Sequence, residues 1–318
     1  MSEPDSTPVL RAAAPAAGPD REILVGYAYA AIGATLFSAK GIIVKLAYAE
    51  GVDAETLLAL RMLLSLPVYF VIGGLSVRDR FARGEALPSA QLLIRAALVG
   101  ALGYWFASYA DFLGLELIPA QFERLILFTY PLFVVVLGAL FFGQPVQRRA
   151  LLAFALSYAG LALIFTAKVA TMGGDATLGA AWVVAAALGF ALYQLLAKEL
   201  IGRIGPRLFT CVAMTGAGVM AIGQFLVVEP LSALAVSPAV LGYGLLIAIG
   251  ATVIPSFFLN AALQRITPQA NATIGTLSPV VTIVMAVFIL GETLTTRDVI
   301  GTALVLGGVG WFTLGGRR

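Results

Sequence analysis

Five ionisable residues stand inside long apolar stretches of the sequence and are the first candidates for chemistry: Lys40, Arg61, Asp111, Glu123 and Arg124. An ionised side chain at the centre of a bilayer costs about 2.5–3.5 kcal/mol on insertion scales, so each one is a functional candidate by default. The chemistry that these residue types allow is the binding of an anionic group by a cation and the uptake and release of a proton by a carboxylate.

The positions of these five residues predict that they share one layer of the membrane. With a helix rise of about 1.5 Å per residue, Lys40 lies about 25 Å along the first apolar run and Arg61 about 9 Å below the outer end of the second. Asp111 lies near the outer end of the third run, and Glu123 and Arg124 lie about one turn into the fourth, from the same side. Two interpretations stay open: a structural network that neutralises itself, with Lys40 and Arg61 reaching toward the interface, or a site in which one carboxylate titrates and a cation holds the substrate.

The elements that must position these residues are transmembrane helices. Sixty per cent of the 318 residues are apolar and 12% are charged, whereas in a soluble domain about 45–50% of residues are apolar and about 25% are charged. The apolar runs are solid blocks rather than the alternating strands of a membrane β-barrel. At about 20 residues per span, the sequence predicts an all-α membrane protein of ten helices, at 23–46, 55–75, 92–114, 119–141, 149–167, 178–198, 207–228, 239–261, 268–290 and 298–315.

The distribution of basic residues predicts the orientation of these helices. With the N-terminus inside, the inner segments hold thirteen Lys and Arg residues and the outer loops hold three, Lys45, Lys168 and Arg297. Basic residues favour the cytoplasmic side of a membrane, so we expect both termini in the cytoplasm, most simply at a bacterial inner membrane. Residues 1–21 lack an apolar period and the form of a signal peptide, and are predicted to be a disordered tail.

An internal repeat relates the two halves of the chain. A constant offset of 148 residues pairs four positions of the first half with four of the second: Pro131 with Pro279, Gly143 with Gly291, Arg149 with Arg297, and Gly160 with Gly308. The first helices of each half pair at an offset of 153, which aligns Phe37 with Phe190. Because each half holds five predicted helices, an odd number, the second copy must be inverted, an arrangement that recurs in secondary transporters.

The late-helix pattern of both halves carries a family resemblance. Pro131 leads to Gly143-Gln144, and Pro279 leads to Gly291-Glu292, each followed by a polar turn and a helix rich in small residues. With the stretch ASYADFLGLELIPAQFERLILFTYP, this pattern resembles the ten-helix EamA-type branch of the drug/metabolite transporter superfamily. The resemblance covers about 23–315 and implies a first EamA-like five-helix repeat at 22–168, an inverted second one at 178–315, and solute transport. It implies no particular substrate. Gln144 stands where the family usually has Glu, so we give it no role in ion coupling.

Further candidates for a central cavity lie near the predicted midplane. Trp105 and Tyr109 are four residues apart and so share a helix face, with Ser108 beside them. Hydroxyl and amide groups in the later helices join them: Tyr193, Gln194, Ser256 and Asn271. Aromatic residues in spans are also common as interface anchors or packing residues. As gating or binding groups, these side chains would suit a small amphiphilic metabolite such as an amino acid.

The second repeat replaces the charged layer with neutral groups. Leu259, Asn271 and Ala272 align with Asp111, Glu123 and Arg124. We therefore expect an outer closure that is electrostatic and an inner one made of packing and amide hydrogen bonds.

Several functional classes are excluded or disfavoured by what the sequence lacks. It contains no histidine and one cysteine, Cys211, which removes histidine-based catalysis and histidine metal ligands. A nucleotide-binding G-x-x-x-x-G-K-[ST] loop is absent, as are an H-E-x-x-H motif and aromatic-interleaved basic stretches. We expect a secondary transporter, rather than an enzyme, that exports a small metabolite by alternating access without a cofactor or metal. Its partners are the solute, the bilayer and, if coupled, protons, but not nucleic acid. A homodimer, and the alternative of a lipid flippase or channel, stay open.

Overall fold

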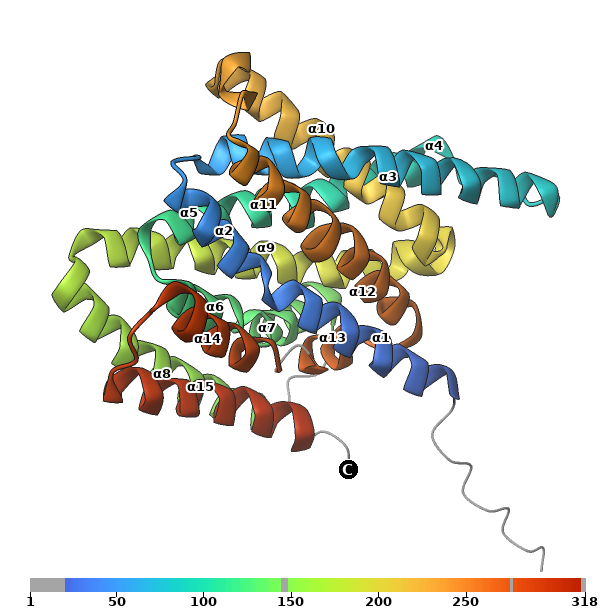
Figure 1. Ribbon diagram of the computed structural model, residues 1–318. Helices are drawn as coiled ribbons and strands as arrows, with labels where there is room; N and C mark the ends of the chain where they lie inside the picture. The colour runs from blue at the N-terminus through green and yellow to red at the C-terminus, as the bar shows by residue number, and fades with distance from the viewer. Residues whose placement is uncertain (1–20, 144–147, 275–276, 316–318) are drawn as a thin grey trace, which may run out of the picture.

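The computed structural model describes residues 21–143, 148–274 and 277–315, and these fold into helices joined by short loops (Figure 1). The predicted N-terminal tail falls outside the described residues up to residue 20, and so does Gln144. Eight helices of the described part are long and apolar enough to cross a membrane, and Val281–Leu290 is a shorter apolar helix. An all-helical membrane fold, as the sequence predicts, is therefore confirmed.

Several spans are built from more than one helical segment, joined end to end. The segments are α1 (Arg21–Ser38), α2 (Lys40–Ala49), α3 (Ala54–Ala82), α4 (Ala90–Gly100), η1 (Ala101–Phe106), α5 (Ala107–Leu117), α6 (Ala120–Leu127), α7 (Tyr130–Phe142), α8 (Arg148–Met172), α9 (Gly174–Ile204), α10 (Pro206–Val228), η2 (Leu231–Leu234), α11 (Pro238–Ala248), η3 (Ile249–Val253), α12 (Ile254–Arg265), α13 (Pro268–Ile274), α14 (Leu277–Leu290) and α15 (Thr296–Gly315). Of the three η segments, η1 and η3 are π-helical turns inside continuous spans and η2 is a 3-10 turn.

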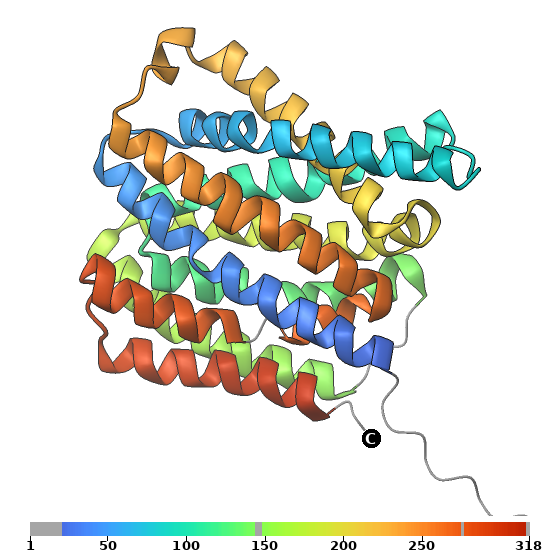
Figure 2. The ribbon, with the colours of Figure 1, turned by 45° about the vertical axis from the view of Figure 1, so that its right-hand side comes forward.

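The spans run back and forth along one direction, so the bundle has two ends (Figure 2). The start of α1 and the end of α15 lie at the same end. Polar side chains cap the starts of two helices. Asp53 accepts a 2.7 Å hydrogen bond from the amide of Thr56 at the start of α3, and Ser237 accepts one of 3.2 Å from the amide of Val240 at the start of α11. Such caps satisfy amides that a helix cannot pair internally.

Glycine allows α4 and α10 to pack with their backbones in contact. A Cβ at Gly100 would lie 2.1 Å from the carbonyl oxygen of Ala213, and a Cβ at Gly216 would lie 2.4 Å from that of Ala97. Close approach through small residues is the usual way in which membrane helices associate, because lipid provides no hydrophobic drive between them.

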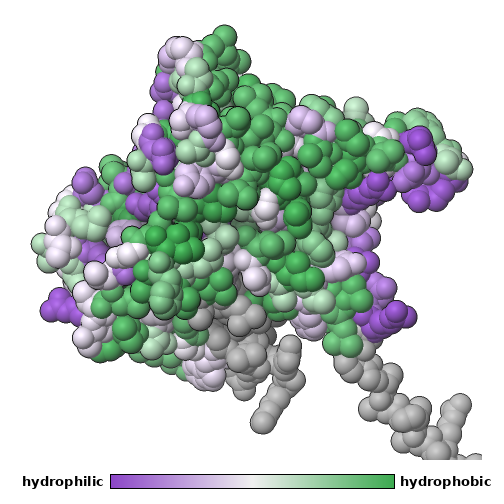
Figure 3. Space-filling view, viewed as in Figure 1, coloured by the Kyte–Doolittle hydropathy of each residue, from purple (hydrophilic) through white to green (hydrophobic). Residues whose placement is uncertain are grey.

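The surface shows which solvent surrounds the bundle. Hydrophobic side chains cover the middle of the molecule and hydrophilic ones gather toward its two ends (Figure 3). Large apolar side chains such as Phe141, Val227 and Phe288 are more than 70% exposed, whereas Lys40, Arg61 and Asp111 are buried. A chain that exposes its apolar groups and buries charges is folded for lipid, so this is a multi-pass membrane protein.

Candidate functional site

Lys40 and Asp111 form a buried ion pair. The Nζ of Lys40 lies 2.5 Å from the Oδ2 of Asp111, and their side chains are 3% and 1% exposed. Lys40 begins α2 directly after the break at Ala39 that separates it from α1, and its ammonium also lies 4.7 Å from the centroid of the Phe37 ring. Asp111 comes from α5. Two apolar spans therefore meet through opposite charges taken out of water.

Glu123 and Arg124 add a second, looser pair beside the first. The Nε of Arg124 lies 3.8 Å from the Oε2 of Glu123. Among the described residues, neither Nε nor Nη2 of Arg124 has a hydrogen-bond partner, and neither oxygen of Glu123 has one. The carboxylates of Glu123 and Asp111 interact electrostatically with each other and with the cations of Lys40 and Arg124. The four side chains form one cluster, which we call the charge cluster, with no net charge when all four are ionised.

Glu292 holds the short helix α6 that presents Glu123 and Arg124. Its Oε1 accepts a 2.7 Å hydrogen bond from the amide of Ala120 and its Oε2 one of 3.1 Å from that of Gln121. A carboxylate at a helix N-terminus accepts hydrogen bonds from amides that the helix leaves unpaired, and its negative charge interacts favourably with the helix dipole. In the sequence, Glu292 belongs to the Gly291-Glu292 pattern that follows Pro279, and this pattern is the available signal for its role.

Removing this carboxylate is expected to loosen α6. Glu292→Ala should lower the free energy of unfolding by about 1–2 kcal/mol, and Glu292→Gln by less, because the amide keeps one acceptor oxygen. Thermal unfolding in detergent, followed by tryptophan fluorescence, measures the change. The matched control is Glu199→Ala, whose side chain is 70% exposed. Equal melting temperatures for Glu292→Ala and the control would contradict the capping role.

Arg61, the fifth predicted charge, is buried but stands apart from the cluster. Its Nη2 donates a 2.9 Å hydrogen bond to the carbonyl oxygen of Tyr104 within the π-helical turn η1. Its guanidinium lies 5.7 Å from the centroid of the Phe112 ring, and the Lys40 ammonium lies 5.8 Å from the same centroid. Arg61 thus ties α3 to η1, and the aromatic ring links it to the charge cluster.

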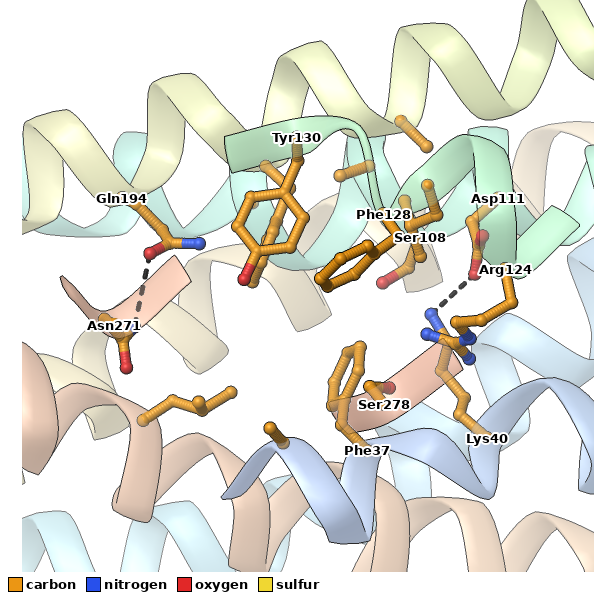
Figure 4. A pocket seen from close by; sticks show the side chains of 17 residues that line it. Phe37, Lys40, Ser108, Asp111, Arg124, Phe128, Tyr130, Gln194, Asn271 and Ser278 are labelled. Atoms are coloured by element: carbon orange, nitrogen blue, oxygen red, sulfur yellow. Dashed lines mark hydrogen bonds and ion pairs between the residues drawn. The ribbon is translucent and has the colours of Figure 1, made fainter. Parts of the chain in front are cut away.

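A cavity runs from the charge cluster into the middle of the bundle (Figure 4). It contains about 690 Å³ of space not filled by atoms, part of it open to the outside. On α9 its lining extends from Ala186 to Gln194, which is about 12 Å of helix at 1.5 Å per residue. Its polar and aromatic lining among the described residues is Phe37, Lys40, Ser108, Asp111, Arg124, Phe128, Tyr130, Phe190, Gln194, Asn271 and Ser278.

The two ends of this cavity differ in chemistry. Lys40, Asp111 and Arg124 lie at one end, and the amides of Gln194 and Asn271 lie at the other (Figure 4). The aromatic rings of Phe37, Phe128 and Tyr130 lie between them (Figure 4). The Phe37 ring also stacks with that of Phe190, with centroids 6.4 Å apart at an interplanar angle of 15°. This arrangement can hold a small molecule with two polar ends.

The other predicted residues divide between this cavity and separate networks. Ser108 and Asn271 line the cavity. Tyr193 instead donates a 2.6 Å hydrogen bond to Oδ1 of Asn260, and Ser256 lies 2.8 Å from the hydroxyl of Tyr69. These are buried hydrogen bonds between helices. Buried polar groups that are satisfied in this way stabilise one arrangement of the bundle.

Trp105 and Tyr109 do share a helix face, as predicted, but that face does not line the cavity. Trp105 donates a 2.6 Å hydrogen bond to Gln224 of α10, and Tyr109 donates one of 2.7 Å to Glu55 of α3. The aromatic lining that sequence reasoning missed comprises Phe37, Phe128, Tyr130 and Phe190. The alignment of Phe37 with Phe190 between the halves was the available signal for two of them.

Comparison with known proteins identifies the class of this membrane protein. The EamA-like transporter family matches residues 24–166 and again 177–314. A curated relative, the uncharacterized transporter YcbK of Bacillus subtilis (strain 168), is 30% identical over 295 residues, which cover 88% of this chain and 90% of that protein. A solved crystal structure matches 93% of this chain and 99% of its own with a TM-score of 0.63 at 17% identity, which is a likeness of fold. The chain belongs to the EamA-like transporter family of the drug/metabolite transporter superfamily.

Proposed function

We propose that the protein is a secondary transporter that exports a small amphiphilic metabolite by alternating access, and that the cavity is its binding site. The observation that carries this is Arg124. Its guanidinium lines the cavity, and its Nε and Nη2 have no hydrogen-bond partner among the described residues. Guanidinium pairs with carboxylate or phosphate through two parallel hydrogen bonds. An anionic group of the solute would supply those acceptors, with Lys40 beside it.

The architecture that we propose is ten spans in two inverted repeats, 22–168 and 178–315. Support comes from equivalent contacts in the two halves. A Cβ at Gly26 would meet Arg265 and Ile266 at the end of α12, and a Cβ at Gly179 would meet Leu117 and Ile118 at the end of α5. Gly26 and Gly179 are 153 residues apart, which is the offset that pairs the first helices of the two halves. The residues that they would meet are 148 residues apart, which is the offset of the later helices.

The π-helical turns support the same architecture. η1 begins at Ala101 and η3 at Ile249, again 148 residues apart. Single π turns inside α-helices often mark functional positions, and η1 supplies both Gly103 to the cavity and the carbonyl that binds Arg61.

For the orientation, we propose that both termini face the cytoplasm and that the charge cluster lies toward the outside, in a bacterial inner membrane. The excess of basic residues in the inner segments supports this. The transporter would work without a cofactor and without catalysing a reaction, and it would act either alone or as a homodimer.

Reconstituted protein tests the transport activity. Proteoliposomes should take up a radiolabelled anionic solute with saturable kinetics, and a substituted Arg124 should remove the saturable part. Uptake that rises linearly with solute concentration would indicate a channel instead. Scrambling of a fluorescent phospholipid in the same vesicles would favour a flippase.

Glu123 is the carboxylate that we propose to titrate during transport. Its ion pair with Arg124 is loose, with 3.8 Å between Nε and Oε2, whereas Asp111 lies 2.5 Å from the Lys40 ammonium. Glu123→Gln should therefore lower uptake driven by a proton gradient at least about tenfold, a change of about 1.4 kcal/mol, and should flatten its dependence on pH. A variant that inserts normally and keeps the wild-type rate and pH profile would rule out coupling through Glu123. Glu199→Gln is the control.

A further inference from the structure

The cavity end opposite the charge cluster is made by two amide side chains. Gln194 of α9 is 1% exposed and Asn271 of α13 is 4% exposed. The Nδ2 of Asn271 donates a 3.2 Å hydrogen bond to the Oε1 of Gln194, and both side chains line the cavity (Figure 4).

This amide pair leaves one NH₂ group and one carbonyl oxygen without a hydrogen bond among the described residues. Among the described residues, the Nε2 of Gln194 and the Oδ1 of Asn271 have no hydrogen-bond partner. The Gln194 nitrogen is directed toward the Tyr130 hydroxyl, which also lines the cavity (Figure 4). A carboxamide has two N–H donors and one acceptor oxygen. If both amides were rotated by 180°, Gln194 would donate to Asn271 instead. The pair would then still leave one NH₂ group and one oxygen without a partner. The demand for a complementary donor and acceptor is therefore a property of the two residues together.

Buried polar groups without partners are costly, so an occupant that satisfies them is favoured over one that does not. A group that carries both an acceptor and a donor, as a carboxamide or a ring amide does, matches them. The cation end of the same cavity offers the unsatisfied Nε and Nη2 of Arg124. The rings of Phe37, Phe128, Tyr130 and Phe190 also line the cavity, and aromatic rings favour a flat, apolar middle of the solute.

We propose that the solute of this cavity is a bipolar molecule with an anionic group at one end, a flat apolar middle and a carboxamide or ring amide at the other. This rests on the proposed function, because it assumes that the cavity is the transport site. It deepens that function by assigning the amide pair to the selection of the far end of the solute. Anions of equal size without an amide are bound at the cation end only.

A ligand series that changes one end at a time tests this assignment. The probes are 4-carbamoylbenzoate, which has both ends, benzoate, which has only the anion, and benzamide, which has only the amide. Their affinities for purified wild-type protein come from calorimetry, and their uptake comes from proteoliposomes. We expect 4-carbamoylbenzoate to bind at least tenfold more tightly than benzoate, and benzamide to bind more weakly than either.

Substituting the amide pair should remove the advantage of the carbamoyl group. Gln194→Met keeps the length of the side chain and removes its hydrogen bonding. It should remove the advantage of 4-carbamoylbenzoate, so that the ratio of its affinity to that of benzoate falls from at least tenfold to about one. Such a double cycle of ligand and side chain isolates their interaction. The matched control is Gln91→Met, at an exposed position in the first turn of α4.

The outcomes separate this inference from the proposed function. If benzoate binds through Arg124 but the carbamoyl group adds less than twofold affinity, the inference is overturned and the anion site stands. If neither anion binds or is transported, the proposed function itself fails. The wild-type comparison of ligands decides the question even where Gln194→Met does not fold.

Discussion

Arg124→Met is expected to abolish saturable transport of an anionic solute while the protein still folds and inserts. Hydrogen bonds to charged groups contribute about 1.5–3 kcal/mol each. The guanidinium lines the cavity, and neither its Nε nor its Nη2 has a hydrogen-bond partner among the described residues. Losing both should weaken anion binding at least about 100-fold, or about 2.7 kcal/mol. Arg124→Lys should lie in between, because an ammonium keeps the charge and loses the planar fork. Calorimetry with benzoate and proteoliposome uptake measure the two effects.

Two controls separate binding from folding in this experiment. Arg95→Met removes an exposed arginine of α4 and should change neither affinity nor uptake. Because Arg124→Met also leaves Glu123 without its neighbouring cation, the double variant Glu123→Gln/Arg124→Met restores charge balance and should still fail to bind. Wild-type affinity in the fully folded Arg124→Met protein would show that the anion site lies elsewhere.

Asp111→Asn is expected to be the most destabilising single substitution in the charge cluster. It leaves the Lys40 ammonium, whose side chain is 3% exposed, without the carboxylate 2.5 Å away, and gives the cluster a net positive charge. Breaking a buried ion pair by removing one partner costs about 3–5 kcal/mol, whereas replacing both partners by neutral groups is often neutral. Lys40→Met/Asp111→Asn should therefore recover most of the lost stability.

Thermal unfolding of the single and double variants in nanodiscs measures this coupling. Lys40→Met alone should also destabilise, because it leaves Asp111 and Glu123 together with only Arg124 to balance them. If Asp111→Asn melts with the wild type, or if the double variant melts no higher than the single one, the pair does not hold α2 against α5. Uptake by the stable double variant then shows whether the pair is needed for transport or only for folding.

Prediction from sequence succeeded where the answer depends on position along a helix. Rise per residue gives height in the membrane, and the estimate that Lys40, Asp111, Glu123 and Arg124 share one layer matches the contacts of the charge cluster. The same estimate places Arg61 in that layer, but it does not identify the carbonyl of Tyr104 as the hydrogen-bond partner of Arg61. Height follows from counting residues, whereas the direction in which a side chain points depends on the rotation of its helix.

Helix rotation also explains the outcome at the third span. Spacing alone shows that Trp105 and Tyr109 share a face. It does not show which neighbouring helix that face meets. Packing against α10 and α3 turns the two aromatic residues toward Gln224 and Glu55, and the same rotation brings Ser108 into the cavity.

The five charges in the apolar stretches mark the difference between what sequence and tertiary structure decide. The sequence by itself determined that lipid surrounds the protein and that the chain is an all-helical membrane protein of the EamA type. It also determined that the charged residues of the first half lie at similar heights. These properties follow from length, composition and spacing, which can be counted along the chain. Only the tertiary structure decided that Lys40 pairs with Asp111, that Arg124 lines a cavity beside them, and that Gln194 and Asn271 lie at the other end of that cavity. Those facts depend on contacts between segments far apart in sequence, and the rotation and packing of whole helices set them.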